Sequence, residues 1–276
     1  MGVVFGVLAA IFLGASDFNA ARASRVIPSL TVTRTALLVS TLAAPILLLI
    51  APFSVHGRDV ALAAGSGVLI CIGLFLLYKA YGIAPIGIVA PTTSVLIALV
   101  PVLFDAVTGH RPGPMGAVGV VLGLTGLALV TYERGGSGSV TTGAVIGTVA
   151  GSIFGAAFVL MARTSHDSGL LPVGIQRASG LVVLLLVRLW HPAPTFAAKG
   201  PSRLPAVMCG VYAVIAIASL QYGYRHGDAG PVSVAVSQFA TAAVVLSVVL
   251  DHERLRRAQV LGIALAAVGV AFLATA

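Results

Sequence analysis

The stretch YGIAPIGIVAPTTSVLIALVPVLFDAVTGHR, residues 81–111, decides the fold because the chain contains a second version of it. A shift of 143 positions, without a gap, brings it onto YRHGDAGPVSVAVSQFATAAVVLSVVLDHER, residues 224–254. The identical pairs include Tyr81/Tyr224, Gly87/Gly230, Val89/Val232, Ser94/Ser237, Val102/Val245, Leu103/Leu246 and Arg111/Arg254. An apolar chain produces identities by chance, so the ungapped register and the matched Gly, Tyr, Ser and Arg are the informative part. They predict an internal repeat.

The front of each half repeats as well. The stretch MGVVFGVLAAIFLGASDFNAARAS at the start matches TTGAVIGTVAGSIFGAAFVLMARTS at an offset of 141. The pairs are Gly2/Gly143, Gly6/Gly147, Gly14/Gly155, Ala15/Ala156, Ala21/Ala162 and Arg22/Arg163. The offset becomes 143 by the second span, where Arg34 meets Arg177. The small residues recur at every fourth position along one helix face, which favours close helix packing.

Composition indicates a membrane protein. The chain is 58% hydrophobic and 9% charged, with a mean hydropathy of +1.07, whereas soluble domains carry about 25% charged residues. The basic residues stand singly near helix ends, so the net charge of +8 is interpreted as a topology signal and not as a nucleic-acid interface. Cys71 and Cys209 lie inside apolar runs and are expected to be small buried residues, neither a disulfide nor a metal pair.

We therefore predict an all-α polytopic membrane protein with ten transmembrane helices arranged as two inverted five-helix repeats, since an odd number of spans reverses the topology of the second half. The first run lacks a signal-peptide pattern and is expected to be a retained helix. The Gly/Ser-rich segment 135–141 is expected to link a first repeat, 1–134, to a second, 142–276. The expected spans are 2–21, 31–51, 60–80, 86–105, 114–132, 142–162, 172–190, 205–224, 230–250 and 258–275.

The fourth and ninth spans carry the most informative face. Small and hydroxyl residues either pack helices together or line a polar cavity, and both interpretations stay open. The prolines at 91 and 101 favour the cavity, because each removes a backbone hydrogen bond that a membrane interior does not replace. Inverted repeats also place the substrate path at their interface. The face consists of Gly87, Ala90, Ser94 and Ala98, matched by Gly230, Ser233, Ser237 and Thr241, with Thr93 and Gln238 beside it.

The third and eighth spans end in aromatic and polar clusters, which are either interfacial anchors or gating and substrate contacts. We expect a central cavity with Tyr78 and Tyr222 toward its ends. The predicted substrate-binding residues are Tyr78, Pro91, Thr93, Ser94, Tyr222, Ser237, Gln238 and Thr241.

Three charged residues are candidates for coupling or gating. Asp17 is the only carboxylate well inside an expected span, and intramembrane acids are usually functional. It forms either an ion pair with Arg22, Arg25 or Arg34, or a proton or substrate site. Arg34 and Arg177 stand at matched positions and are candidate anion-binding groups.

Motifs of enzymes are missing from the sequence. It contains no HExxH, Walker loop, GxSxG or CxxC pattern, and the GxG at residues 65–67 has no Rossmann context. No catalysis, cofactor, metal or nucleotide-driven transport is therefore predicted.

Three segments resemble EamA-type transporters of the drug/metabolite transporter superfamily. They are GASDFNAARASR at 14–25, APTTSVLIALVPV at 90–102 and DHERLRRAQVLG at 251–262. The family's turn commonly reads G-E-R-L followed by a glycine, and here His252 stands in place of the first glycine.

The resemblance implies a multi-pass transporter of the inner (plasma) membrane. It would move a small polar or amphipathic metabolite or drug by alternating access, often as an exporter, with a coupling proton or counter-substrate as a possible partner beside the lipid bilayer. The alternative is a non-transporting membrane scaffold or partner subunit, which a dry interface between the halves would favour.

The distribution of basic residues predicts an orientation. Lys and Arg number 11 on the side of the loop after the first span and 5 on the other side. The positive-inside rule therefore places the first loop in the cytoplasm and both termini outside, whereas the resemblance implies cytoplasmic termini.

We expect cysteines introduced at Arg25, Arg203 and Arg256 to resist an impermeant thiol reagent added to intact cells, and Arg58→Cys, on the opposite side, to react. The reverse pattern would overturn the charge count and favour the orientation that the resemblance implies.

Overall fold

The computed structural model describes residues 1–49, 52–107, 113–131, 138–190, 194–226, 232, 235–236, 238–252 and 255–273. Within these ranges the chain forms ten α-helices and a short 3-10 turn, η1 (His166–Ser168), and no strand. The helices are α1 (Gly2–Ser24), α2 (Ser29–Leu47), α3 (Gly57–Ile83), α4 (Ile86–Val107), α5 (Pro114–Thr131), α6 (Gly138–Ala162), α7 (Leu171–Val187), α8 (Arg203–Arg225), α10 (Phe239–Leu250) and α11 (Arg257–Leu273).

Prolines set several helix boundaries. Pro28 precedes α2 with an extended backbone (ψ 134°). Ala84, which follows α3, is extended as well (φ −138°, ψ 155°) because the residue before a proline, here Pro85, avoids the helical region. α5 begins on Pro114, since the first helical position needs no N–H donor.

The helices agree with the expected spans in number and approximate position. Five of them, α1, α2, α3, α6 and α8, are long and apolar enough to cross a membrane, while the described parts of the others hold shorter apolar stretches. The second and seventh spans were predicted too long, because α2 ends at Leu47 and α7 at Val187. Part of the ninth span, expected at 230–250, lies outside the described residues, and α10 begins at Phe239. Ten membrane crossings therefore stay a prediction.

α6 begins at Gly138, inside the segment 135–141 that was expected to be a linker. Residues 132–137 lie outside the described part of the chain. The division into repeats 1–134 and 142–276 thus stays a prediction.

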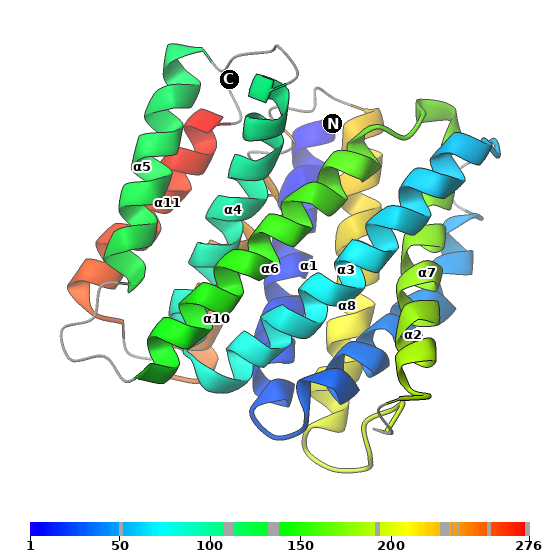
Figure 1. Ribbon diagram of the computed structural model, residues 1–276, viewed down its shortest axis with the longest axis horizontal. Coiled ribbons are helices and arrows are strands. Elements are labelled where there is room, and N and C mark those ends of the chain that lie inside the picture. The colour runs from blue at the N-terminus through cyan, green and yellow to red at the C-terminus, as the bar shows by residue number, and fades with distance from the viewer. Residues whose placement is uncertain are drawn as a thin grey trace.

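The helices form one elongated array (Figure 1). α5 and α11 pack against each other at one edge, and α2 and α7 lie at the opposite edge, with the other helices between them. α3 and α6 run side by side across the face nearest the viewer. α1 begins and α11 ends at the same end of the array.

Two bundles make up most of this array, and each combines helices from both halves of the chain. In the first, called the α3 bundle, α3 packs along α6 and α7, and α6 packs along α4. In the second, called the α1 bundle, α1 packs along α8 and α10, and α8 packs along α2. Helices that are distant in sequence therefore hold each bundle together.

Glycines bring the helices of each bundle into backbone contact. A Cβ added at Gly14 in α1 would lie 2.8 Å from the carbonyl oxygen of Phe239 in α10. A Cβ added at Gly155 in α6 would lie 3.1 Å from the carbonyl oxygen of Leu96 in α4. The expectation that the glycine stripes serve close helix packing is thus confirmed at these positions.

The pairing of α5 with α11 predicts a sensitive position. A Cβ at Gly126 would lie 2.6 Å from Ala266 N and 2.7 Å from Gly262 O, so the two helices must separate. We expect Gly126→Ala to destabilise the protein by about 1–3 kcal/mol, as overpacking does, measured by thermal unfolding in detergent. The control is Gly113→Ala, where an added Cβ meets nothing within 4 Å. Equal unfolding temperatures for both variants would show that the helices do not pack this closely.

Candidate functional site

The buried carboxylate of Asp17 lies between α1 and α3. Asp17 is 4% exposed, and the hydroxyl of Tyr81, itself 0% exposed, donates a hydrogen bond of 2.8 Å to its Oδ2. The ion pair with Arg22 or Arg25 that the sequence suggested is wrong. Both arginines reach Asp251 at the end of α10 instead, at 3.4 and 3.7 Å. A tyrosine thus holds α1 to α3 at this level.

A second set of polar contacts continues from this pair toward α8. The Tyr78 hydroxyl lies 3.0 Å from Cys209 Sγ, and Ser16 Oγ donates to the carbonyl oxygen of Cys209 at 3.0 Å. Tyr78 is fully buried and therefore not an interfacial anchor. The tyrosine cluster, defined as Ser16, Asp17, Tyr78, Tyr81 and Cys209, joins α1, α3 and α8.

The cysteines are both buried and reduced, as the sequence predicted. Cys209 nevertheless differs from Cys71 in having polar neighbours, which its apolar sequence context gave no reason to expect.

Arg177 projects from α7 into the interior. Its side chain is buried and lies within electrostatic range of Tyr78 and Cys209. Its Nε has no hydrogen-bond partner among the residues that the structure describes. Arg34, at the matched position on α2, is completely buried as well. Sequence reasoning therefore selected two arginines that the fold places inside.

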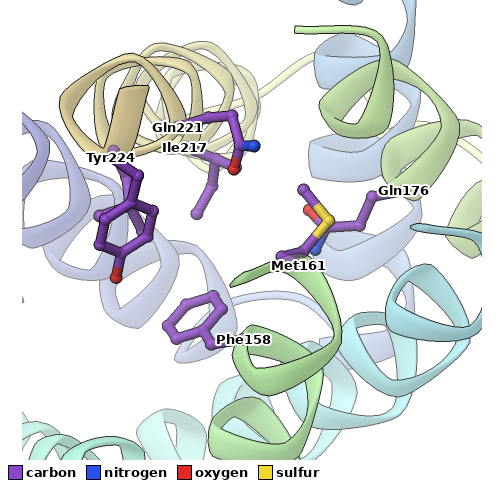
Figure 2. A pocket seen from close by; sticks show the side chains of 7 residues that line it. Phe158, Met161, Gln176, Ile217, Gln221 and Tyr224 are labelled. Atoms are coloured by element: carbon purple, nitrogen blue, oxygen red, sulfur yellow. The ribbon is translucent and has the colours of Figure 1, made fainter. Parts of the chain in front are cut away.

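A pocket opens between α6, α7 and α8 (Figure 2). Its cavity volume is about 10 Å³, which is room for about one water molecule. Phe158 and Tyr224 stand on facing helices, and the side chain of Gln176 reaches toward the space from α7. Gln176 is completely buried, and its Oε1 has no partner in the described part of the chain, while its Nε2 donates to Ser66 Oγ at 2.7 Å. The lining residues are Phe158, Met161, Gln176, Ile217, Leu220, Gln221 and Tyr224.

The pocket occupies the repeat-equivalent place of the Asp17–Tyr81 pair. An offset of 141 relates Asp17 to Phe158, and an offset of 143 relates Tyr81 to Tyr224. At equivalent positions of the repeat, one half therefore has a buried polar contact and the other half has a largely apolar pocket.

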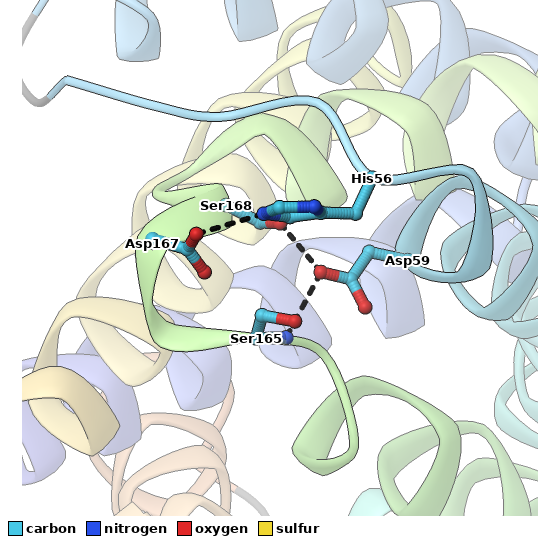
Figure 3. Close-up of polar contacts among 5 residues, drawn as sticks. All are labelled: His56, Asp59, Ser165, Asp167 and Ser168. Atoms are coloured by element: carbon cyan, nitrogen blue, oxygen red, sulfur yellow. Dashed lines mark hydrogen bonds and ion pairs between the residues drawn. The ribbon is translucent and has the colours of Figure 1, made fainter.

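A third polar group, at one end of α3, ties it to the connection between α6 and α7 (Figure 3). Asp59 accepts hydrogen bonds from Ser165 N at 3.0 Å and from Ser168 Oγ. His56 Nε2 lies 2.8 Å from Asp167 Oδ2, and this hydrogen bond holds the pKa of the Asp167 carboxyl below its ordinary value. All five residues belong to the α3 bundle or its connections, so the group stabilises that bundle.

The predicted cavity residues of α4 are buried in helix packing. The Thr93 hydroxyl donates to Val89 O at 2.9 Å and to Gly147 O of α6 at 3.2 Å. Pro91 and Ser94 are buried on the same helix. None of these three lines the pocket between α6, α7 and α8, and their substrate-binding role stays a prediction.

Their counterparts in the second half are described only in part. Ser237 lies outside the described residues. Thr241 Oγ1 donates to Gln238 Oε1 at 3.4 Å, beside the start of α10. Tyr222 is half-buried and stacks on His226, with ring centroids 4.0 Å apart, while the ring of Phe5 lies tilted against it. A central cavity at Ser94 and Ser237 accordingly stays a prediction.

Sequence reasoning missed most of the residues that line the pocket, and only Gln221 and Tyr224 belong to the aromatic and polar cluster that it noted at the end of the eighth span. Gln176, Met161 and Ile217 stand in ordinary apolar helices, and nothing in their sequence context marks them. Phe158 and Tyr224 had a signal, because the repeat offsets relate them to Asp17 and Tyr81.

An apolar array of helices with buried polar contacts at its centre belongs to the class of polytopic membrane proteins. Residues 141–275 match the family model described as EamA-like transporter family. The resemblance found in the sequence is thereby confirmed for the second half of the chain, which is similar to the EamA-like transporter family.

Comparison with solved structures supports the fold. One crystal structure of a protein aligns with a TM-score of 0.68 at 19% sequence identity, covering 98% of this chain and 95% of the other. At this identity the likeness concerns the fold alone. No curated protein matches the chain.

The Asp17–Tyr81 contact predicts a measurable coupling. We expect Tyr81→Phe to destabilise the protein by about 1–3 kcal/mol, because it leaves a buried oxygen without its donor. The effect should shrink in an Asp17→Asn background, which a double-mutant cycle of thermal unfolding would measure. Tyr212→Phe is the matched control, since among the described residues Tyr212 forms only a ring contact with Phe12. Additive effects of the two changes would contradict the contact.

Proposed function

We propose that the protein is a secondary transporter that moves a small polar or amphipathic metabolite or drug across the cell membrane by alternating access between two inverted repeats. Export is the direction that the family resemblance favours. The match of residues 141–275 to a transporter family supports transport in general. The support for the mechanism comes from contacts that recur at matched positions of the two halves.

Contacts between α5 and α11 support a two-fold relation between the repeats. A Cβ at Gly126 would meet Ala266 and Gly262, whereas a Cβ at Gly269 would meet Gly123 and Gly119. An offset of 143 converts each of these residues into its counterpart. Each contact between the two helices thus occurs twice, the second time with the two halves of the chain exchanged. Such a reciprocal pair of contacts is the signature of a two-fold axis.

Hydrogen bonds inside the two bundles repeat in the same way. Ser16 in α1 donates to the carbonyl oxygen of Cys209 in α8, and Ser66 in α3 donates to that of Ala157 in α6. Ser16 matches Ala157 and Ser66 matches Cys209 under the two offsets. The bundles therefore use equivalent surfaces, with donor and acceptor exchanged.

The observation that carries the proposal is a difference between the two ends of the bundle interface. At one end, α1 packs on α3 and the Asp17–Tyr81 hydrogen bond closes the contact. At the other end, the equivalent helices α6 and α8 leave the pocket between Phe158 and Tyr224, and α7 packs less on α8 than α2 does on α3. One end is sealed by a hydrogen bond, and the other keeps a small pocket between its helices.

Inverted repeats that adopt different conformations are how such transporters alternate access. Asp17 and Tyr81 lie near the ends of α1 and α3, whereas Phe158 and Tyr224 lie near the ends of α6 and α8, which Figure 1 shows at the opposite end of the array. In the opposite state, the two bundles would rock so that Phe158 and Tyr224 approach each other and Tyr81 leaves Asp17. Ser94, Ser237, Gln238 and Thr241 are proposed to border the path between these two ends.

The test measures how accessible the pocket is when the Asp17–Tyr81 hydrogen bond at the other end is removed. We expect Phe158→Cys to react with an impermeant thiol reagent from the side on which α1 begins. Adding Tyr81→Phe should slow that reaction by up to about threefold, because losing a hydrogen bond of about 1 kcal/mol shifts the equilibrium about fivefold toward the state with a closed pocket.

Two results separate the alternatives. Tyr212→Phe, added in place of Tyr81→Phe, should leave the labelling rate unchanged. An unchanged rate with Tyr81→Phe as well would indicate a rigid bundle interface, and the protein would then fit a membrane scaffold better than a transporter.

A further inference from the structure

Asp17 is a buried acid within a helix that is long and apolar enough to cross a membrane. Its side chain forms no ion pair with any residue that the structure describes, and Arg22 and Arg25 reach Asp251 instead. The Tyr81 hydroxyl donates to it at 2.8 Å. Removing a carboxylate from water costs more free energy than one hydrogen bond returns. The neutral, protonated form of Asp17 is therefore the one that fits the closed contact between α1 and α3.

The ionisable groups around Asp17 do not neutralise a negative charge on it. Tyr78 and Cys209 lie within electrostatic range of both Asp17 and Arg177, but Arg177 does not reach the carboxyl. Between its bounds, α10 carries no ionisable residue. A proton is therefore the cation that can neutralise Asp17 in this state. The ionisable side chains on the other helices around α1 are Tyr78, Lys79 and Tyr81 of α3, Cys209 and Tyr212 of α8, Arg34 of α2, Arg177 of α7 and Asp105 of α4, whose side chain lies outside the described residues.

The proposed rocking of the bundles would change the surroundings of Asp17. Asp17 lies near the end of α1 and Tyr81 near the end of α3. When these helices separate, Tyr81 leaves the carboxyl and water reaches it from the side on which α1 ends. An aspartic acid in water is ionised at neutral pH. The two states of the bundle interface would thus differ by one bound proton.

We propose that Asp17 binds a proton when α1 closes on α3 and releases it when these helices separate. The proton comes from water on the side on which α1 ends, bonds to the carboxyl oxygen that does not accept from Tyr81, and returns to the same side. Protonation in the closed state is independent of the proposed function, whereas release rests on it, since release requires the bundles to move. The proton thereby regulates which end of the path is open.

The direction of the pH dependence follows from which state holds the proton. The state closed at Asp17 binds it and the opposite state does not, so a falling pH favours closure at Asp17 and an accessible pocket at Phe158. One proton changes the equilibrium by at most about tenfold per pH unit. Histidines also titrate near neutral pH, and His56 and His226 lie on the pocket side. The informative quantity is therefore the difference that Asp17→Asn makes.

The first experiment tests protonation itself, on the full-length protein in lipid nanodiscs at neutral pH. Infrared difference spectra between protein with ordinary and with isotope-labelled aspartate isolate the carboxyl bands of its aspartates. We expect a protonated-carboxyl band that Asp17→Asn removes and Tyr81→Phe shifts, because the Tyr81 hydroxyl donates to this group. The control is Asp167→Asn, which changes an exposed carboxylate paired with His56 and should leave the band in place.

Two spectra would overturn the proposal. One is a spectrum of the unmodified protein without a protonated-carboxyl band, which decides the matter even if Asp17→Asn does not fold. The other is a band that neither Asp17→Asn nor Tyr81→Phe changes.

The second experiment measures the effect of the proton on the two states. The labelling rate of Phe158→Cys is divided by that of Arg58→Cys, an exposed position on the same side, to correct for thiol ionisation. This ratio should rise about twofold or more between about pH 8 and about pH 6. With Asp17→Asn, which cannot exchange the proton, the ratio should stay near its low-pH value throughout. An equal pH response with and without Asp17→Asn would overturn the release step.

The outcomes also separate this inference from the proposed function. If the band behaves as expected while Phe158→Cys labelling ignores Tyr81→Phe, the proton site stands, and its release is overturned together with alternating access. If the labelling responds to Tyr81→Phe and no protonated-carboxyl band is found, the transporter stands and the proton site is wrong.

Discussion

Backbone contact between helices is the constraint on which the rest of the structure depends. A membrane interior offers no hydrophobic force between apolar helices, so close packing has to supply the attraction. Glycines at matched positions, such as Gly14 and Gly155, let the two bundles form from helices that are distant in the chain. Once α1 lies on α8 and α6 on α3, the positions of Asp17, Tyr81 and Cys209 follow from helix geometry.

Some contacts between helices are the same in both halves of the chain, and others differ. The glycine contacts and the Ser16 and Ser66 hydrogen bonds recur in both halves, because both bundles need them to assemble. The lining of the interface between the bundles does not recur, since Asp17 in one half corresponds to Phe158 in the other. Assembly therefore tolerates divergence at the bundle interface, which is where transport chemistry would have to differ.

The internal repeat allowed the helical architecture to be predicted from the sequence, whereas only some residues of the candidate site could be predicted. Helix number, glycine packing and the burial of Cys71 and Cys209 follow from hydropathy and from residue spacing, which are properties of single helices. Contacts between helices do not follow from them. Asp17 was expected to meet Arg22 or Arg25, its neighbours along the chain, yet α10 brings Asp251 to those arginines and α3 brings Tyr81 to Asp17. Gln176 and Met161 gave no signal, because an apolar helix has no feature that tells a pocket wall from a lipid-facing side.

If the bundles alternate between two states as proposed, the divergence of Asp17 and Phe158 has an energetic consequence. In identical repeats the two closed ends would be chemically equivalent, and neither state would be preferred by the protein alone. Here one end closes through a hydrogen bond between buried groups and the other would close through aromatic rings. A buried hydrogen bond contributes about 1 kcal/mol, and an aromatic pair contributes about 0.5–1.5 kcal/mol beyond its burial. The two ends would therefore close through contacts of similar strength but different chemistry, so that a substitution at either end would shift the balance between the two states.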